Sequence, residues 1–317
     1  MKKSSKFLTG WRQFYKQWQL QLFALLGMAF LLVFCYTPLF GIIIAFKDFS
    51  INDGFGGIFT SKWNSFRFFK EFFTYYRFGE LLKNTLVLSV LKLVFTFPAP
   101  ILLAILLNEM RNKAFKRIVQ TVSYFPNFIS WILVYTLANA FFSVDIGLVN
   151  QLLIKAGIVE KGIPLMTAPE YFYGTAVFWA VWKNMGWWSI IFLAAITGID
   201  PGLYEAAQID GAGRFSRIWH ITLPGIKGAI VTVLILSIGG LLGGNMGGSN
   251  FDQSYIFGNS MNNSTSEIIQ TYAFSMGLAK GRFSYATAVD LCQSIISVTL
   301  ILISNKVAKL TTGEGIF

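Results

Sequence analysis

Residues 198–228 read GIDPGLYEAAQIDGAGRFSRIWHITLPGIKG and lie between two long apolar runs. Asp200 followed by Pro201 is an N-cap residue with proline at the first helical position, so we expect a helix that begins there and runs to about Ile209. The Asp-Gly-Ala-Gly sequence at 210–213 then interrupts the helical pattern, because glycine favours turns over helix interiors. The first half of the stretch therefore predicts a helix followed by a tight turn.

The second half predicts another helix over about 214–222 that stops before Pro224, where the next apolar run opens. The whole stretch contains three basic and three acidic residues, so it has no net charge. A neutral hairpin favours docking by shape over attraction to acidic lipid.

The composition excludes an ordinary soluble protein. Of the 317 residues, 54% are hydrophobic and 13% are charged, and the mean hydropathy is +0.57. A soluble domain averages about 25% charged residues. With two cysteines, both inside apolar runs, and one histidine, we expect neither a disulfide framework nor a metal site. The fold class expected is an all-α polytopic membrane protein, with a single transmembrane domain over 1–317.

Six apolar segments meet or approach the roughly 20 residues that a helix needs to cross a bilayer. A group of basic residues precedes the first, as in a signal peptide, but its length and the missing cleavage site favour an uncleaved anchor. The predicted spans are 22–46, 85–107, 118–142, 173–196, 229–245 and 284–304.

Basic residues are unevenly divided between the two sides of these spans. The side that contains 1–21, 108–117, 197–228 and 305–317 holds 14 basic and five acidic residues, whereas the other side holds 10 and nine. The positive-inside rule places the more basic side in the cytoplasm. We therefore expect both termini there, including a cytoplasmic N-terminal segment over 1–21. The net charge of +11 then reflects topology and not nucleic-acid binding.

The segments on the other side are the longer ones. The first, 47–84, is rich in aromatic residues, which suggests a short helix lying on the outer interface. An ordinary aromatic belt explains the same composition equally well.

The hairpin carries a spaced motif: Glu-Ala-Ala, three residues, Gly, nine residues, Ile, one residue, Leu-Pro. This resembles the EAA loop of permease subunits in bacterial ABC importers at every fixed position. Similar short runs extend the resemblance over most of the chain, at NTL 84–86, LLNE 106–109, 120–131, WK 182–183 and ATAV 286–289. Together they are similar to carbohydrate-uptake permeases related to one maltose-transporter subunit. The resemblance implies a type I ABC importer transmembrane domain in the bacterial inner membrane, with its core over 80–305.

The resemblance also implies that loop 200–224 docks into a cleft of a separate ATP-hydrolysing subunit. The residue types in the loop support this docking role. The small alanines leave a flat surface, the glycine permits a strained turn, and the glutamate carboxylate can pair with an arginine of the partner. A surface hairpin without a partner is the alternative. The expected coupling residues are Glu205, Ala206, Ala207, Asp210, Gly211, Ile221, Leu223 and Pro224.

The remaining components follow from the same resemblance. The chain has no G-x-x-x-x-G-K-S/T sequence, so we expect no cofactor on it and place ATP and Mg²⁺ on the partner. The expected partners are a second homologous permease, an ATPase dimer, an extracytoplasmic solute-binding protein, an oligosaccharide and membrane lipid, with no nucleic acid.

Ionisable residues within a span usually face a bundle interior or an aqueous cavity. Lys183, Asn184 and Trp187 share one face of the fourth span by their spacing. A sugar ring offers an apolar face to an aromatic ring and hydroxyls to amides, so this face suits a carbohydrate path. The alternative is that the tryptophans, including Trp182, fill gaps between helices and Lys183 pairs with a neighbour.

Two further candidates lie in the fifth and sixth spans. Asp290 could pair with Lys92 or Lys183, or favour a cationic sugar. A glycine cluster suits close helix crossing and would also allow unwinding near Asn245. The FDQ sequence at 251–253 follows, where it either touches substrate or a binding protein or forms a solvated loop.

Two other functions fit the composition less well. A membrane-embedded glycosyl or acyl transferase needs converging acids or histidines, and the chain has neither H-E-x-x-H nor DxD. A permease for another solute, such as a peptide or an amino acid, is the closer alternative.

Overall fold

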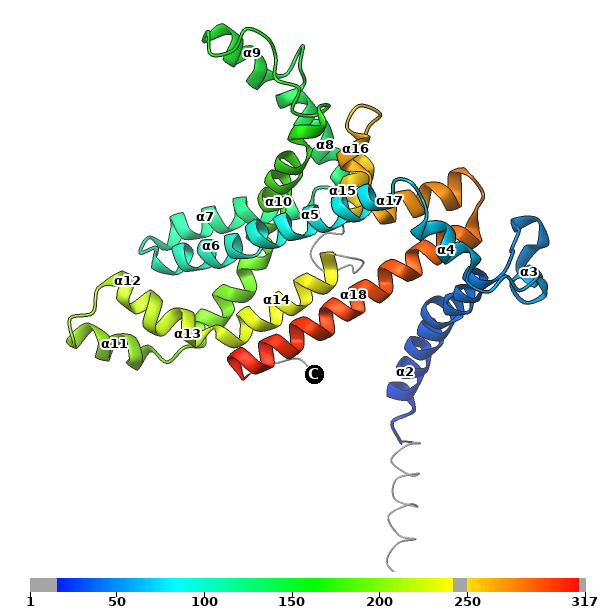
Figure 1. The fold of residues 1–317 in the computed structure, drawn as a ribbon. Helices are drawn as coiled ribbons and strands as arrows, with labels where there is room; N and C mark the ends of the chain where they lie inside the picture. The colour runs from blue at the N-terminus through cyan, green and yellow to red at the C-terminus, as the bar shows by residue number, and fades with distance from the viewer. Residues whose placement is uncertain (1–15, 242–249, 314–317) are drawn as a thin grey trace, which may run out of the picture.

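The computed structural model describes residues 16–241 and 250–313, where the regular elements are helical apart from a β-bridge between Lys47 and Trp63. Within these residues, three helices are long and apolar enough to cross a membrane: Trp18–Phe46, Phe78–Glu109 and Phe283–Leu310. Three bent pairs of helices meet the same test together, so counting each pair as one span gives six. The predicted all-α membrane fold is confirmed (Figure 1).

The first span stands apart from the other helices for most of its length (Figure 1). It comprises α2 (Trp18–Leu31), a π-helical turn η1 (Leu32–Tyr36) and a 3-10 helix η2 (Thr37–Phe46). No side chain of α2 is buried, although the helix is apolar on all sides. Only the C-terminal end of the span packs firmly, where Ala45 is fully buried in a core that includes α18 (Phe283–Thr312). A helix that is apolar all round is typical of a segment surrounded by lipid or by other helices.

The second and fourth spans form the centre of the molecule. The second is α5 (Phe78–Thr96) followed by α6 (Pro98–Glu109), and the fourth is α10 (Pro169–Thr197). Proline at the first position of α6 needs no helical N–H partner, so the two helices continue as one span. Phe192 and Ile196 of α10 are buried against Ala104 of α6. These contacts fix α10 against the second span.

The third span differs from the prediction of one helix over 118–142. The chain forms α7 (Lys113–Tyr124), a 3-10 turn η4 (Phe125–Phe128) and α8 (Trp131–Phe142), with a bend of 106° between the two parts. Pro126 lies at the start of the 3-10 turn, Ile129 is extended, and the Ser130 hydroxyl caps the new helix. A hydropathy window detects the apolar residues but not this break. The helix α9 (Leu148–Lys155) follows α8 at the end farthest from α11 (Pro201–Ile209) (Figure 1).

The fifth and sixth spans lie side by side. The fifth contains α14 (Lys227–Leu241), which begins two residues before the predicted start, and it packs along α18. A Cβ atom added to Gly239 would lie 3.0 Å from Cδ1 of Ile301. This agrees with a packing role for the first glycines of the cluster. Asn245 and the predicted unwinding lie outside the described residues.

The longer segments between spans also fold into short helices. Residues 47–84 contain η3 (Ile51–Asp53), α3 (Gly54–Thr60) and α4 (Arg67–Phe73), so this segment has more helix than predicted. The segment before α18 contains α15 (Asn250–Phe257), α16 (Asn263–Ser266), α17 (Ile269–Phe274) and the π-helical turn η6 (Ser275–Ala279). Both segments lie on the side of the spans opposite to α11.

Candidate functional site

The first helix of the hairpin begins and ends where the sequence predicts. In α11, the Asp200 side chain accepts a hydrogen bond from the backbone N–H of Gly202 at 2.9 Å, and Pro201 occupies the first helical position. The cap satisfies one of the free N–H groups at the helix start. The hairpin is therefore set at a defined angle after α10, with a bend of 70° between the two helices.

The turn is a Schellman motif built on one glycine. Gly211 has φ +77°, in the left-handed region. The N–H of Ala212 donates to the carbonyl of Ala207 at 2.8 Å, and the N–H of Gly211 donates to that of Gln208 at 3.1 Å. These two bonds satisfy carbonyls at the end of α11. No atom lies within 4 Å of a Cβ added at Gly211, so the backbone conformation, and not space, requires glycine.

The second helix does not stop before Pro224, and that expectation is wrong. It continues through α12 (Arg214–Arg217), a π-helical turn η5 (Ile218–Thr222) and α13 (Leu223–Gly225) before a bend of 63° leads into α14. The wider π turn shifts the hydrogen-bonding register just before proline. Pro224 then lies in the first turn of α13, where a missing N–H costs little.

Two contacts hold the hairpin together and against the second span. The hydroxyls of Tyr204 and Thr222 are 3.0 Å apart and join the two helices. Nε of Arg214 lies 4.0 Å from the carboxylate of Glu109 at the end of α6. The hairpin is thus connected to the spans through side chains as well as through its own chain ends.

The predicted coupling residues divide between an exposed surface and an internal one. Glu205, Ala206 and Asp210 are exposed, and Ala207 is half-buried. In the second helix, Leu223 packs against the core between α6 and α10, Ile221 is half-buried and Pro224 is exposed. The first part of the motif is therefore available to a partner, whereas Leu223 joins the hairpin to the spans.

The hairpin also presents large apolar side chains that are not fixed positions of the spaced motif. Ile209 and Phe215 are each 88% exposed, and Trp219 is 69% exposed. Ile209 ends the first helix, and Phe215 and Trp219 lie on the second, in a segment with no net charge. Bulky apolar residues in so short and otherwise polar a hairpin are a sequence signal for a docking surface.

Lys183 is buried and bonded to the break in the third span. Its Nζ donates to the backbone carbonyls of Pro126, Asn127 and Ile129, at 2.7 Å for Asn127, and lies 5.6 Å from the ring centre of Trp131. These carbonyls lie in the 3-10 turn and the extended residue after it, where the α-helical pattern of hydrogen bonds is interrupted, although the Pro126 carbonyl also accepts from the N–H of Ile129 at 3.1 Å. The ammonium group satisfies them in place of water.

The other residues of the predicted face differ in exposure. Asn184 is 9% exposed and donates to Ala180 of its own helix at 2.9 Å. Trp187 is 43% exposed and packs edge-to-face on Phe128 with ring centres 5.6 Å apart. Trp182, half-buried, packs edge-to-face on another tryptophan of α10. Of the predicted face, Trp187 presents the most surface.

The two charged residues of the neighbouring spans do not meet. Lys92 of α5 is 2% exposed, whereas Asp290 of α18 is exposed. Among the residues described, no ion pair joins Asp290 to Lys92 or Lys183. The carbonyls of the third span bind Lys183 instead.

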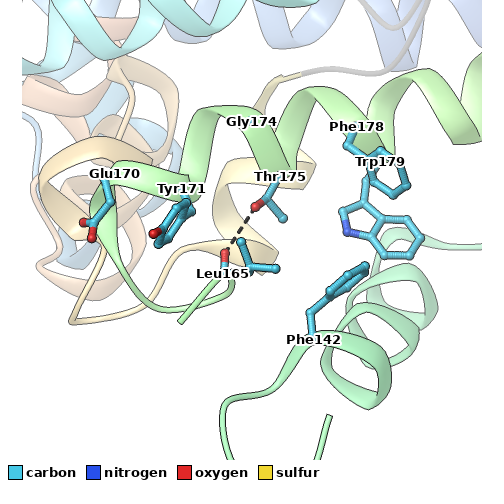
Figure 2. A pocket seen from close by; sticks show the side chains of 8 residues that line it. All are labelled: Phe142, Leu165, Glu170, Tyr171, Gly174, Thr175, Phe178 and Trp179. Atoms are coloured by element: carbon cyan, nitrogen blue, oxygen red, sulfur yellow. Dashed lines mark hydrogen bonds between the residues drawn. The ribbon is translucent and has the colours of Figure 1, made fainter. Parts of the chain in front are cut away.

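A mainly apolar pocket of about 380 Å³ lies beside the N-terminal half of α10 (Figure 2). Its aromatic walls include Trp179, whose indole N–H has no partner in the described part of the chain. The Thr175 hydroxyl donates to the carbonyl of Leu165 at 3.1 Å and joins the helix to the preceding loop. The lining residues are Phe142, Leu165, Glu170, Tyr171, Gly174, Thr175, Phe178 and Trp179.

Residues 96–310 match the family model described as "Binding-protein-dependent transport system inner membrane component". The chain belongs to this family. The match begins in the second span and includes the hairpin and the sixth span. The chain is thus a membrane component of an importer that works with a separate solute-binding protein.

Two relatives from Bacillus subtilis are similar over nearly their whole length. The protein LplB is 44% identical over 291 residues, which are 92% of this chain and 88% of LplB. The polygalacturonan/rhamnogalacturonan transport system permease protein YteP is 43% identical over 302 residues, 95% of this chain and 91% of YteP.

A solved structure supports the same family. A chain from the crystal structure of a bacterial ABC transporter that imports the acidic polysaccharide alginate has a TM-score of 0.84 and 33% identity, with 95% of this chain and 99% of that chain covered. The predicted type I importer fold is confirmed at this level of similarity.

Proposed function

We propose that this family member is the permease subunit that forms half of the translocation pathway of an ATP-driven importer for oligosaccharides. The observation that carries the coupling role is the hairpin 200–224: a capped helix, a glycine-dependent turn and exposed apolar side chains joined to two spans. Relatives named for polygalacturonan, rhamnogalacturonan and arabino-oligosaccharide transport support the substrate class. They support an oligosaccharide over the peptide or amino-acid alternative.

The complete transporter contains further subunits in this proposal. A second homologous permease completes the pathway, and an ATPase dimer binds ATP and Mg²⁺. The exposed carboxylate of Glu205 meets a basic group of the ATPase, while Ile209 and Phe215 enter an apolar part of its cleft. Ion pairs and apolar anchors of this kind dominate small docking surfaces. The solved alginate transporter was crystallised in complex with a sugar-bound periplasmic protein, which supports an extracytoplasmic partner here.

The proposed orientation follows the charge asymmetry. The hairpin and both termini lie in the cytoplasm, and α15, α16 and α17 lie on the extracytoplasmic side. Within the spans, Trp187 with Trp182 contributes apolar surface to the solute path. Lys183 and Asn184 support this face from behind, since both are buried and engaged with backbone. Asp290 and Asn245 remain candidates for polar contacts along the path.

Glu205→Ala tests the coupling role in the complete transporter. Purified complexes should lose ATPase subunits, or hydrolyse ATP without uptake, because a charge-assisted contact is removed. Glu160→Ala is the matched control, since Glu160 is exposed on the opposite side of the spans. Uptake of oligosaccharides and of peptides into proteoliposomes tests the substrate class. Normal coupling in Glu205→Ala, or uptake of peptides alone, would contradict the corresponding part of the proposal.

A further inference from the structure

A second pocket, of about 430 Å³, lies among α15, α16 and α17 on the side opposite to the hairpin. Its volume falls in the range of roughly 300–1,000 Å³ that is usual for small-molecule sites. Among the described residues, its lining contains five serine or threonine hydroxyls and two asparagine amides, and no basic side chain. Such a lining offers many neutral donors and acceptors in a small space.

The loop that forms one wall is held in a fixed shape. The N–H of Asn259 donates to Oδ1 of Asn262 at 2.9 Å, and the N–H of Asn262 donates to Oδ1 of Asn259 at 3.2 Å. Both side-chain amides also donate to the carbonyl of Met166, which precedes α10. A wall with its hydrogen bonds already made costs little to organise when a ligand binds.

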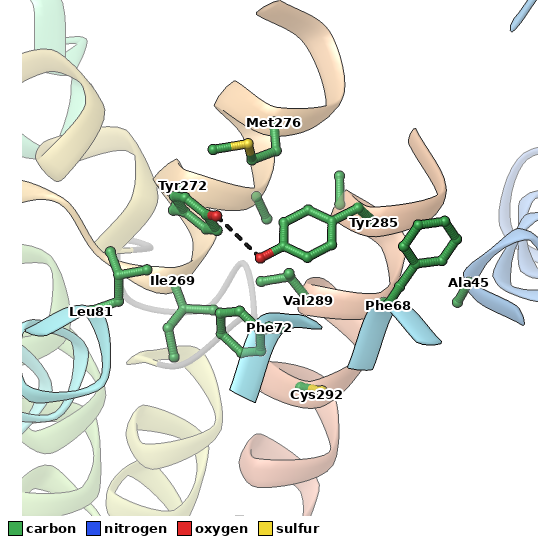
Figure 3. Packing of buried hydrophobic residues seen from close by; sticks show 13 residues of the cluster. Ala45, Phe68, Phe72, Leu81, Ile269, Tyr272, Met276, Tyr285, Val289 and Cys292 are labelled. Carbon is green, nitrogen blue, oxygen red and sulfur yellow. Dashed lines mark hydrogen bonds between the residues drawn. The ribbon is translucent and has the colours of Figure 1, made fainter. Parts of the chain in front are cut away.

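Another part of the wall belongs to α17, a helix anchored in a core. The hydroxyl of Tyr272 on α17 lies 3.1 Å from that of Tyr285 on α18, and both rings pack among buried residues of α4 (Figure 3). Thr271 of the same helix lines the pocket, and its hydroxyl bonds to the backbone of Ile268. Two parts of the pocket wall are therefore held in place by contacts outside the pocket.

The only carboxylate among the described lining residues, that of Glu267, is ion-paired. Glu267 accepts from Arg77 at 2.6 Å, and the same guanidinium donates to Glu80 at 2.6 Å. The hydrogen bond with Glu80 and the negative charge of Glu267 raise the pKa of Arg77, so the cation persists at all ordinary pH values. Because one guanidinium is shared by two carboxylates, Arg77, Glu80 and Glu267 together keep a net charge of −1. Since the described lining residues also include no basic side chain, the pocket offers nothing that attracts an acidic ligand.

A buried hydroxyl in the lining, that of Ser254, has no partner among the described residues. Ser254 on α15 is 3% exposed, and no described residue hydrogen-bonds to its Oγ. A buried polar group without a partner destabilises a protein unless something else satisfies it. A Cβ added at the neighbouring Gly258 would lie 2.5 Å from the backbone oxygen of Ser254 and 3.1 Å from Oγ of Ser266, so a larger residue would not fit between these serines.

An aromatic surface borders the pocket. Tyr255, which lines it, is 56% exposed and stacks on Phe251 with ring centres 5.5 Å apart. Phe274 packs edge-to-face on Tyr255 at 5.2 Å. An exposed aromatic face beside hydroxyls and amides matches a pyranose or furanose ring, which has an apolar C–H face and polar edges.

We propose that this pocket binds an uncharged sugar unit of the imported oligosaccharide, with Ser254 hydrogen-bonding a sugar hydroxyl and Tyr255 contacting the ring face. The assignment rests on the proposed function and adds a subsite on the side where solute enters. The absence of a basic side chain among the described lining residues distinguishes this subsite from one that recognises a uronic acid by charge.

The test uses the complete transporter in lipid nanodiscs without its binding protein. Equilibrium binding is measured with arabinotriose as the neutral probe and trigalacturonate as the acidic one. Ser254→Ala should weaken binding of arabinotriose by roughly 3- to 10-fold, the effect of one neutral hydrogen bond. Ser143→Ala removes another buried hydroxyl without a partner, outside the pocket, and should leave binding unchanged.

A second pair of variants tests the pocket by obstruction. Ser260→Trp places a large ring on the exposed rim and should abolish arabinotriose binding. Ser264→Trp makes the same change on an exposed serine of α16 outside the lining and should leave arabinotriose binding intact. Because both sites are exposed, these variants keep the test decisive even if Ser254→Ala impairs folding.

Uptake by the wild-type transporter separates the two proposals. If it imports neither probe nor any other oligosaccharide, the proposed function is wrong. If it imports oligosaccharides but Ser254→Ala and Ser260→Trp bind arabinotriose like the wild type, the pocket assignment is wrong and the proposed function stands. If the transporter imports and binds only trigalacturonate, the assignment of a subsite for uncharged sugars is likewise wrong, and the proposed function stands.

Discussion

Replacing Gly211 with valine should uncouple transport through the backbone of the turn. Gly211 has φ +77°, and its N–H and that of Ala212 close the Schellman motif at the end of α11. Gly213, two residues along the same exposed turn, has φ −67° and ψ 170°, which any residue adopts. Neither glycine has an atom within 4 Å of an added Cβ, so valine meets no obstacle at either position. Gly211→Val and Gly213→Val therefore differ mainly in the backbone conformation that the valine must adopt.

The size of the effect follows from this comparison. An L-residue in the left-handed region costs about 1–2 kcal/mol, and β-branched valine lies at the high end. If the turn relaxes to avoid that cost, the docking-competent hairpin becomes about 5- to 30-fold less populated and the apparent affinity for the ATPase falls equally. Gly211→Asn should lose less of this affinity, since asparagine tolerates the left-handed conformation. Gly213→Val should remain near the wild type.

The assay is titration of the purified ATPase against the permease pair in nanodiscs, followed by uptake measurements at saturating ATPase. We expect the wild type and Gly213→Val to bind the ATPase most tightly, Gly211→Asn less tightly, and Gly211→Val least tightly. Equal loss in Gly211→Val and Gly213→Val would show that the ATPase rejects bulk anywhere on the turn. Wild-type behaviour of Gly211→Val would refute the docking role of the turn itself.

Three further predictions concern the spans. Lys183→Met should lower the thermal stability of the detergent-solubilised complex, because hydrogen bonds from a charged group contribute about 1.5–3 kcal/mol each and three carbonyls lose their donor; an unchanged melting temperature would show that water replaces the ammonium group. Trp187→Ala should reduce uptake while assembly and basal ATPase activity stay normal, and failed assembly would identify Trp187 as a packing residue. A reporter fused after Phe317 should report the cytoplasm and one inserted near Lys161 the outside, and the opposite result at either site would overturn the orientation.

The hairpin was the most predictable part of the chain because its signals are local. An acidic cap before proline specifies a helix start, and glycine at the end of the helix specifies a left-handed turn, within a few residues in each case. The error at Pro224 has a physical reason as well. Proline rules assume α-helical hydrogen bonds, and the π-helical turn Ile218–Thr222 changes that register just before the proline. No simple residue pattern in this stretch specifies such a turn.

The third span and Lys183 show what local patterns miss. Pro126 in an apolar run and a lysine in a different span are each ambiguous when considered alone. A bend of 106° exposes carbonyls at membrane depth, where water is absent and each free carbonyl is costly. A donor must therefore approach from another helix, and Lys183 lies 57 residues away from Pro126 in the chain. The lysine and the broken helix explain each other: the break supplies acceptors that make a buried cation tolerable, and the cation makes the break tolerable. An ionisable residue in a span thus has two common explanations, a solute path or a broken helix, and a proline within another apolar run of the same chain favours the second.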